Sequence, residues 1–352
     1  MKTIAKLACF LIPLAFISCT KPKDKTLIIW TNNTEIVSYV ELFNATHEKT
    51  KAVVVYKKEP ARALPPSKDE IIPDIIIGPW LKNSLTRKYF TSMDYLFAEK
   101  SISKTQFYKK LLDYGCINEK QYLLPVSFNL PAMIFSKKNE SLVGNDHYLD
   151  FEHIKETAKK FNAKNDKEAY TTMGFGPSWD SEFLYTLTKL DGASYHEKGT
   201  SFLWNQEAMH NSINRIQYWT KFCNTDTTTE QNFQFRYLYM PFYRQVTSGR
   251  CLYAYTTSDN LFTLTDAQSS SISFRWIVQN NKIPVEDNIL TMGIYKGAEH
   301  SAQAEVFITW LLKEETQQKL IERTENMKLD SVNFGIAGGF SSLHDVNEKY
   351  YP

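Results

Sequence analysis

This sequence lacks the residue patterns that mark several common classes of enzyme and metalloprotein. It has no GxSxG, HExxH or Walker motif, and none of its seven histidines stands four residues from another. Cysteine is scarce: of five in the chain, only Cys116, Cys223 and Cys251 lie beyond the N-terminal segment, and no two form a CxxC pair. This set argues against a disulfide framework and a zinc knuckle, allows at most one bridge, and predicts three buried thiols.

An excess of charge and a membrane-spanning apolar run are also missing. Lysine and arginine total 41 against 39 for aspartate and glutamate, so the net charge does not indicate nucleic acid as a partner. The apolar run from Leu7 to Ser18 is shorter than the roughly 20 residues that a permanent transmembrane helix needs. The remaining chain is long enough for two domains of ordinary size.

The N-terminal segment has the order of a secretory signal peptide. Lys2 and Lys6 precede the apolar run, and a small residue stands just before Cys19. Phe16-Ile17-Ser18-Cys19 resembles the lipobox of bacterial lipoproteins, which implies that residues 1–18 are removed and that Cys19 is lipidated, with palmitate among its acyl groups. Residues 19–25 would then tether an extracytoplasmic protein to the periplasmic face of the cell membrane. The alternative is an ordinary cleaved signal with an incidental cysteine.

Alternating strand-like and helix-like stretches predict an α/β protein. The runs 26–30, 53–56 and 74–78 are short, continuous and apolar, as expected for strands buried on both faces of a parallel sheet. Between the first two, Ile36 and Val40 begin a helical spacing of apolar residues. No internal repeat or low-complexity stretch interrupts the pattern.

The rest of the chain continues this alternation. Further strands are expected at 123–126, 132–135, 172–176, 272–278 and 289–294. Helices are expected after the N-cap residues Asp150 and Asn205, and from a cap at Ser301. Four tryptophans fall within or beside these patterns and are interpreted as packing residues: Trp204, Trp219, Trp276 and Trp310.

Four segments, in order along the chain, resemble the bacterial extracellular solute-binding proteins of the maltose-binding type. They are Leu27-Ile28-Ile29-Trp30, Pro73-Asp74-Ile75-Ile76, the proline-containing hinge strand 124–128 with the strand 132–135, and the stretch from Gly293-Ile294-Tyr295-Lys296-Gly297 to Glu314-Glu315-Thr316-Gln317-Gln318. The resemblance spans about residues 26 to 326, which is nearly all of the chain after the N-terminal segment.

The resemblance implies two α/β lobes of the type II-like periplasmic-binding-protein fold, which close on a ligand. Lobe I would comprise 26–125 and 280–313, and lobe II 126–279 and 314–352, with crossings near Val126, Gln279 and Lys313. The implied function is that of a monomeric substrate-binding lipoprotein of an ABC importer. Such a protein needs no cofactor and docks on a membrane permease that carries a cytoplasmic ATPase.

Loops that follow strands are the expected ligand site, because ligands of open α/β sheets bind beyond the carboxyl ends of strands. A sugar presents a C–H face to an aromatic ring and hydroxyls to polar side chains. The candidate stacking residues are Trp30, Trp80, Phe128, Trp179 and Tyr255. The candidate hydroxyl partners are Asn32, Asn33, Glu35, Asn129, Asp180 and Asp259. The alternative is that the aromatics are core; Trp179 is interpreted as a ligand contact, and Tyr255 is left open.

The opposing hypothesis is a lipid-anchored carbohydrate-active hydrolase. A glycosidase needs two carboxylates roughly 5 to 9 Å apart across a cleft, and sequence spacing does not exclude such a pair. A binding protein for a sugar or oligosaccharide, in contrast, should have no enzymatic activity and should return its ligand unchanged.

Overall fold

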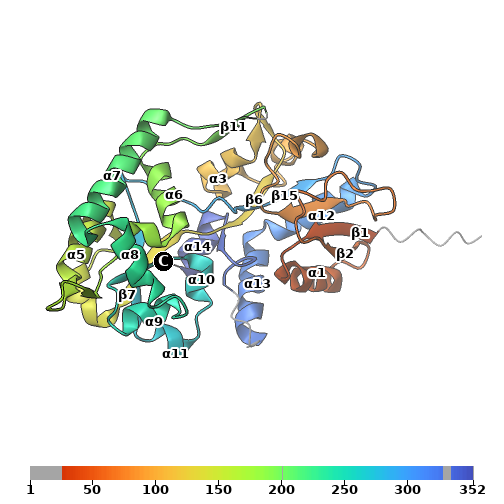
Figure 1. Cartoon of the computed structure of the whole chain (residues 1–352). Coiled ribbons are helices and arrows are strands. Elements are labelled where there is room, and N and C mark those ends of the chain that lie inside the picture. Colours follow the sequence, from red (N-terminus) through yellow and green to blue (C-terminus); the bar gives the residue numbers. More distant parts are fainter. Residues whose placement is uncertain (1–25, 200, 328–333, 352) are drawn as a thin grey trace, which may run out of the picture.

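The chain folds into two lobes, each built around its own sheet (Figure 1). The computed structural model describes residues 26–199, 201–327 and 334–351. Within those ranges no helix combines the length and the apolar character needed to cross a membrane. The expected two-lobe α/β architecture is confirmed.

Lobe I contains a six-stranded sheet in the order β16-β6-β15-β3-β1-β2. Its strands are β1 (Thr26–Thr31), β2 (Lys51–Tyr56), β3 (Ile75–Gly78), β6 (Leu124–Phe128), β15 (Leu290–Ile294) and β16 (Phe340–Ser341). β1 pairs in parallel with β2 and β3. The expected burial on both faces is wrong for β2, because it is an edge strand whose Val53 and Tyr56 are exposed. β15 runs antiparallel to both of its neighbours, β3 and β6, so the sheet is mixed.

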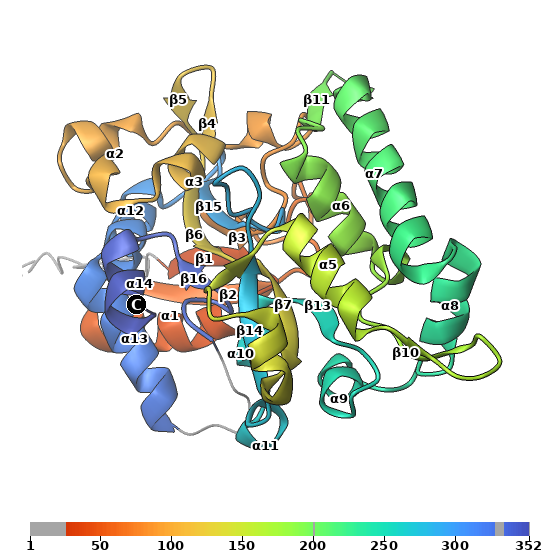
Figure 2. The ribbon, with the colours of Figure 1, turned by 90° about the vertical axis from the view of Figure 1, so that its left-hand side faces the viewer.

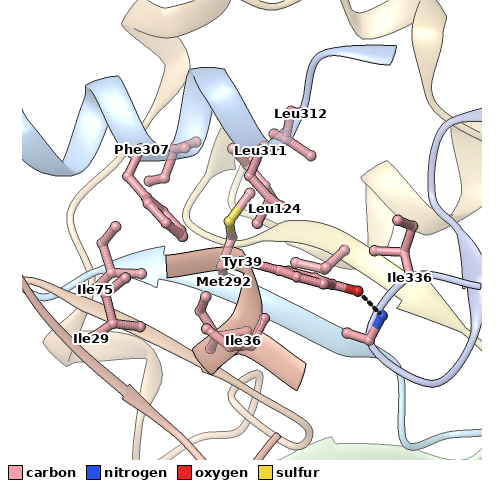
Figure 3. Close-up of a cluster of buried hydrophobic side chains, with 14 of the residues drawn as sticks. Ile29, Ile36, Tyr39, Ile75, Leu124, Met292, Phe307, Leu311, Leu312 and Ile336 are labelled. Carbon is pink, nitrogen blue, oxygen red and sulfur yellow. Dashed lines mark hydrogen bonds between the residues drawn. The ribbon is translucent and has the colours of Figure 1, made fainter. Parts of the chain in front are cut away.

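One large apolar core joins the lobe I sheet to its helices. These helices are α1 (Glu35–Thr46), α2 (Asp94–Ala98), α3 (Lys109–Tyr114), α12 (Ser301–Leu311), α13 (Glu314–Met327) and α14 (His344–Tyr350). Figure 3 shows Tyr39, Met292 and Phe307 in this core, contributed by α1, β15 and α12. The Tyr39 hydroxyl accepts a 2.8 Å hydrogen bond from the backbone N–H of Ala337, which fastens α1 to the C-terminal part of the chain.

The C-terminal part of the chain belongs to lobe I, which corrects the expectation that residues 314–352 complete lobe II. Leu320 of α13 and Val346 of α14 are buried in the lobe I core, and β16 pairs with β6 in its sheet. α13 packs against α12 on one side and α14 on the other (Figure 2). The crossing expected near Lys313 is therefore wrong, because α12 and α13, on either side of it, pack in the same lobe.

Asp74 ties the start of α12 to the lobe I sheet. Its Oδ1 accepts a 2.8 Å hydrogen bond from the backbone N–H of His300, and its Oδ2 accepts one of 2.9 Å from Ile28. The helix does begin at Ser301, but its N-cap residue is His300 and no side chain caps it, so the cap expected at Ser301 is wrong. The buried carboxylate takes over part of what a capping side chain would do.

Lobe II is built on a four-stranded sheet in the order β13-β7-β14-β8. The strands are β7 (Pro131–Ser136), β8 (Tyr148–Leu149), β13 (Tyr253–Thr257) and β14 (Ile272–Ile277). The helices are α4 (Glu140–Val143), α5 (Phe151–Phe161), α6 (Ser181–Leu190), α7 (Gln206–Asn224), α8 (Thr227–Phe235), α9 (Phe242–Thr247), α10 (Ser258–Phe262) and α11 (Asp266–Ser269). The two expected N-caps are confirmed, because Asp150 accepts from the His153 N–H at 2.7 Å and Asn205 from the Ala208 N–H at 3.1 Å.

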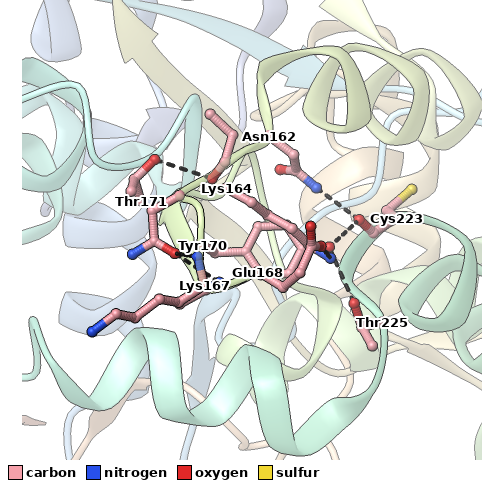
Figure 4. A network of polar contacts seen from close by, with 11 residues as sticks. Asn162, Lys164, Lys167, Glu168, Tyr170, Thr171, Cys223 and Thr225 are labelled. Atoms are coloured by element: carbon pink, nitrogen blue, oxygen red, sulfur yellow. Dashed lines mark hydrogen bonds and ion pairs between the residues drawn. The ribbon is translucent and has the colours of Figure 1, made fainter.

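Short hairpins and single turns complete the described fold. The hairpins are β4–β5 (Cys116–Ile117 and Lys120–Gln121), β9–β10 (Ala163–Lys164 and Tyr170–Thr172) and β11–β12 (His196–Lys198 and Ser201–Leu203), and the 3₁₀ turns are η1 (Arg87–Tyr89), η2 (Lys104–Gln106), η3 (Lys137–Asn139) and η4 (Pro177–Trp179). In Figure 4 the Tyr170 hydroxyl and the Asn162 amide donate to the Cys223 carbonyl at 3.1 and 2.7 Å, which fixes β9–β10 to the end of α7. The strand expected at 172–176 is wrong in extent, since β10 ends at Thr172.

Cys116, Cys223 and Cys251, the cysteines of the described residues, are free thiols. Cys223 and Cys251 are buried, and burial raises the pKa of their thiols to about 11 and about 12, so both stay protonated at neutral pH. Cys116 is half-buried, so the expectation of three buried thiols holds for two of them.

Candidate functional site between the lobes

Trp30, expected to stack on a ligand, has no exposed surface. It lies in a lobe I cluster with Ile76 and Leu81, and the Lys57 Nζ sits 4.1 Å from its ring centroid. The residue is the fifth of the six in β1, and the sheet directs its ring into the lobe. The structure therefore corrects its assignment as a stacking residue.

The side chain of Trp179 also packs against its own lobe. Its indole Nε1 donates to the Glu230 carbonyl at 2.9 Å, and its ring stacks on Phe233 with centroids 5.8 Å apart. The fully buried Glu230 carboxylate accepts from the Ser178 hydroxyl at 2.5 Å and from Asn224 at 2.7 Å, and burial raises its pKa. These contacts hold η4 against α8. The interpretation of Trp179 as a ligand platform is corrected accordingly, since its ring joins the lobe II core.

Phe128 and Tyr255 lie near the crossings between the lobes and are each only 8% exposed. The Tyr255 hydroxyl donates to Glu286 at 3.0 Å and pairs with Thr186 at 3.2 Å, and burial raises the pKa of both Tyr255 and Glu286. The question left open for Tyr255 is answered by this burial, because the ring packs within lobe II. Neither residue presents an aromatic face to a solute.

Most of the expected hydroxyl partners bind other parts of the chain. Asn33 donates to the Ala337 carbonyl at 2.8 Å, and Asn129 donates to the Gly338 carbonyl at 3.1 Å while accepting from Ser258 at 2.5 Å. Three carboxylates also accept hydrogen bonds from the chain: Glu35 from the Tyr39 hydroxyl at 3.1 Å, Asp180 from the backbone at the start of α6, and Asp259 from the Thr257 hydroxyl. The side chain of Asn32 is half-exposed. The loop 335–339 thus binds polar side chains that were expected to contact a ligand.

Burial raises the pKa of Glu35 to about 7, although hydrogen bonds from Tyr39 and from the backbone at 337–338 oppose the shift. Burial disfavours the charged form of a carboxyl group, so near neutral pH Glu35 is partly protonated. This half-buried carboxyl group lies against the backbone of the loop 335–339.

Trp80 is the expected stacking residue that does present a free face. It follows β3 with a positive φ of 62° and is 55% exposed. Asn83 stabilises the turn by donating to the Trp80 carbonyl at 2.9 Å. Ser84, in the same loop, reaches lobe II: its backbone N–H donates to the Glu197 carboxylate in the β11–β12 hairpin at 2.9 Å. The loop 79–86 therefore lies beside that hairpin.

Charged and hydroxyl side chains gather where this loop meets lobe II and the crossing 278–289. We call the following residues the interlobe cluster: Lys82, Ser84, Tyr114, Tyr185, Lys189, Glu197 and Asp287. Asp287 accepts from the Tyr185 hydroxyl and from Lys189 Nζ, the latter at 2.8 Å. Lys82 Nζ lies 4.9 Å from the Tyr114 ring, and burial lowers its pKa. Burial, with smaller effects from the charges of Asp287 and Glu197, raises the pKa of Tyr114 to about 12.

A row of aromatic rings extends from this cluster along the hairpin. The aromatic row consists of Tyr185, Tyr195, Phe202 and Trp204, with successive ring centroids 5.0, 5.7 and 6.3 Å apart. The first two pairs are stacked, and the outer rings are open, with Phe202 55% and Trp204 44% exposed. Trp204 is therefore not the packing residue expected, whereas Trp219 is fully buried, and Trp276 and Trp310 pack partly buried against apolar clusters.

The aromatic row lies outside the loops at strand ends, where the ligand site was expected. Tyr185 lies in α6, and the other members lie in or beside a hairpin. The available signal was three aromatics at positions 195, 202 and 204 on both sides of the glycine at 199, a spacing that a short hairpin brings together. No group of three or more potential metal ligands occurs among the residues the structure describes.

The two lobes, their short crossings and the polar cluster between them define the class of two-lobe solute-binding proteins. Residues 39–327 match the family described as Bacterial extracellular solute-binding protein, and the chain belongs to that family. It is accordingly an extracytoplasmic, non-enzymatic solute-binding component of an ABC transporter, and the hydrolase hypothesis is set aside. Comparison with curated proteins found no match.

Several solved structures share this fold at low sequence identity. CpMnBP1 with mannobiose bound has a TM-score of 0.64 and 14% identity, over 93% of this chain and 84% of that one. An ABC substrate-binding protein from Listeria monocytogenes in complex with cycloalternan has a TM-score of 0.62 and 13% identity, over 93% of this chain and 83% of that one. The galacto-N-biose-/lacto-N-biose I-binding protein from Bifidobacterium longum, in complex with lacto-N-biose, has a TM-score of 0.59 and 14% identity, over 91% of this chain and 78% of that one.

Proposed function

We propose that this chain captures a sugar or oligosaccharide between its lobes and delivers it to the permease of an ABC importer. The observation that carries the proposal is the aromatic row, which starts at the interlobe cluster and ends in two exposed rings. The inner rings support the outer ones, so the open faces of Phe202 and Trp204 are held in position. Such faces match the C–H faces of sugar rings.

The polar groups beside the aromatic row suit the hydroxyls of the same ligand. Lys82, Glu197 and Asp287 offer both donors and carboxylate acceptors within the interlobe cluster. Across from the hairpin, Trp80 is the proposed stacking residue of lobe I, and half-exposed Asn32 follows the neighbouring strand β1. Proteins of like fold solved with mannobiose, lacto-N-biose and cycloalternan support a carbohydrate ligand.

Closure follows from where these groups lie. Ser84 belongs to lobe I and Glu197 to lobe II, while Asp287 lies on the crossing 278–289. A solute that contacts all three elements binds best when the lobes are close, so it shifts the population toward the closed form. We propose that this closed, monomeric form docks on the permease, with Cys19 as the lipidated anchor; residues 1–25 lie outside the described part of the chain.

The test is a ligand screen with two readouts. A panel of mono- and oligosaccharides, amino acids and polyamines is scanned for a rise in melting temperature, since a ligand that binds only the folded state stabilises it. Hits are then titrated by calorimetry and recovered to check that they are chemically unchanged. At least one carbohydrate should bind with saturation; binding confined to amino acids or polyamines contradicts the proposal.

A further inference from the structure

A second concave surface lies on lobe I, formed by residues outside the interlobe cluster. It is a cavity of about 520 Å³ lined by Arg87, Lys88, Phe90, Thr91, Ser92, Ile117, Asn118, Tyr122 and Lys296. This volume lies within the range of about 300 to 1,000 Å³ that is typical of small-molecule sites. Nothing in the proposed capture of a sugar uses it.

The charge of this cavity is of one sign. Arg87, Lys88 and Lys296 line it, and no aspartate or glutamate does. Within the described residues, none of these three cations forms an ion pair, whereas Lys189 and Arg215 elsewhere in the chain lie 2.8 and 2.6 Å from a carboxylate. Three cations around one cavity raise the local concentration of anions, and a bound anion would relieve their mutual repulsion.

The backbone brings these cations together. The N–H of Lys296 donates to the Tyr89 carbonyl at 2.7 Å, so the segment after β15 is held against η1, which contains Arg87 and Lys88. Phe90 and Tyr295 form an isolated bridge, and the Thr91 N–H donates to the Ile294 carbonyl at 3.0 Å. Residues more than two hundred positions apart in sequence are thus placed in register before any ligand arrives, which lowers the entropic cost of binding.

The lining of the cavity combines a closely packed aromatic ring with polar side chains. Phe90 is 3% exposed and, with Leu123, lies so close to Gly293 that a Cβ there would be only 2.6 Å from the Phe90 ring. Thr91, Ser92 and Asn118 add hydroxyl and amide groups. Guanidinium and ammonium groups beside hydroxyls are the donors that phosphate oxygens accept from.

We propose that this cavity binds a phosphate-bearing anion, at a site separate from the sugar site between the lobes. A phosphorylated small molecule and the headgroup of an anionic phospholipid share this chemistry. The two sources are distinguished by whether the phosphate group binds when free in solution or only at a membrane surface.

The test uses the purified mature protein and two probes at constant ionic strength. Inorganic pyrophosphate is titrated by calorimetry, and sedimentation is measured with vesicles of phosphatidylglycerol and phosphatidylcholine against phosphatidylcholine alone. The variant Arg87→Gln with Lys296→Gln is compared with Lys110→Gln with Lys221→Gln, which removes the same charge from exposed positions outside the cavity. Melting temperatures verify that all forms are folded.

We expect saturable binding to at least one probe that weakens about tenfold or more in the cavity variant and stays unchanged in the control. Binding of pyrophosphate identifies a soluble phosphate ligand, and binding of anionic vesicles alone identifies a lipid headgroup. Absence of binding to both probes overturns the proposal, as does an equal loss in the two variants. Sugar affinity should be the same in all forms, which separates this site from the one between the lobes.

Discussion

The backbone N–H of Ser84 in lobe I donates to the Glu197 carboxylate in lobe II across 2.9 Å. This hydrogen bond joins the loop after β3 to the tip region of the β11–β12 hairpin, next to the aromatic row. Under the proposed closure, the lobes would lose this contact when they separate. The balance between open and closed forms should therefore respond to a change at Glu197.

Glu197→Ala should weaken binding of the sugar identified in the screen by about fivefold, because a partly exposed hydrogen bond to a charged group contributes modestly to closure. Small-angle scattering should show a larger radius of gyration for the unliganded variant than for wild type. Glu207→Ala, which removes an exposed carboxylate from the first turn of α7, is the control and should match wild type. Identical affinity and radius in Glu197→Ala would show that the hairpin does not hold the lobes.

Phe202→Ala should lower sugar affinity about tenfold or more, because it removes the exposed ring in the middle of the aromatic row. Its melting temperature should change little, since the ring is 55% exposed. Phe235→Ala on α8, where the ring is 74% exposed and outside the row, provides the matched control. Calorimetric titration measures the sugar affinity of each variant. Equal affinities in the two variants would show that the aromatic row is not part of the binding site.

Trp179→Ala should destabilise the protein rather than weaken binding directly. The substitution removes a ring stacked on Phe233 and an indole that bonds Glu230, leaving a cavity that costs about 3 kcal/mol or more. Urea unfolding should show this loss in the free energy of unfolding. The comparison is Trp204→Ala, whose exposed ring should change that free energy by less than about 0.5 kcal/mol. If Trp204→Ala lowered the free energy of unfolding more than Trp179→Ala, Trp179 would not be a packing residue.

Glu35 should make stability depend on pH. Its pKa in the folded state is about 7, above the usual carboxyl value of 4.5, so the folded protein retains a proton that the unfolded chain releases. The stability that this proton contributes is complete below about pH 4.5 and is lost as pH rises toward 7. Glu35→Gln stays neutral, so its free energy of unfolding relative to wild type should rise by roughly 2 to 3 kcal/mol between pH 4.5 and 8.

The measurement for Glu35 is urea unfolding at several pH values. Glu48→Gln, which changes an exposed carboxylate after α1, is the control and should follow the wild-type pH profile. Parallel profiles for Glu35→Gln and wild type would mean that Glu35 titrates as a solvated group.

Cys19→Ala should abolish lipidation and release the exported protein from membranes. Metabolic labelling with a fatty-acid analogue, followed by separation of membrane and soluble fractions, measures both effects. Cys9→Ala, within the segment expected to be removed, should retain the label on the mature protein. Label that persists in Cys19→Ala would contradict the lipobox resemblance.

The order of elements was readable from local patterns. Continuous apolar runs predicted β1 and β3, and the side chains of Asp150 and Asn205 marked the starts of α5 and α7. These features depend on residues near one another in sequence, such as a capping oxygen and an N–H three residues later. For the same reason the family resemblance could be seen in short segments.

Which side chains meet a solute was decided by packing over long distances in sequence. Trp30, Trp80 and Trp179 all stand at or near strand ends or turns. Trp30 is fully buried, Trp179 packs partly buried against lobe II, and Trp80 is exposed. Local sequence does not determine whether an aromatic ring packs against its own lobe or faces the other lobe. Burial of the ring lowers the free energy in both orientations, as long as an apolar surface is there to cover it.

The C-terminal part of the chain shows the same limit. Leu320 and Ile321 of α13 are buried in the lobe I core, and this placement depends on a surface shared with α12 and on β16 pairing with β6. The hydrophobic effect has no preferred partner, so periodicity along one helix leaves the choice of sheet open. Only the folded chain, by bringing Ala337 to Tyr39 and the loop 335–339 over Glu35, selects one of them.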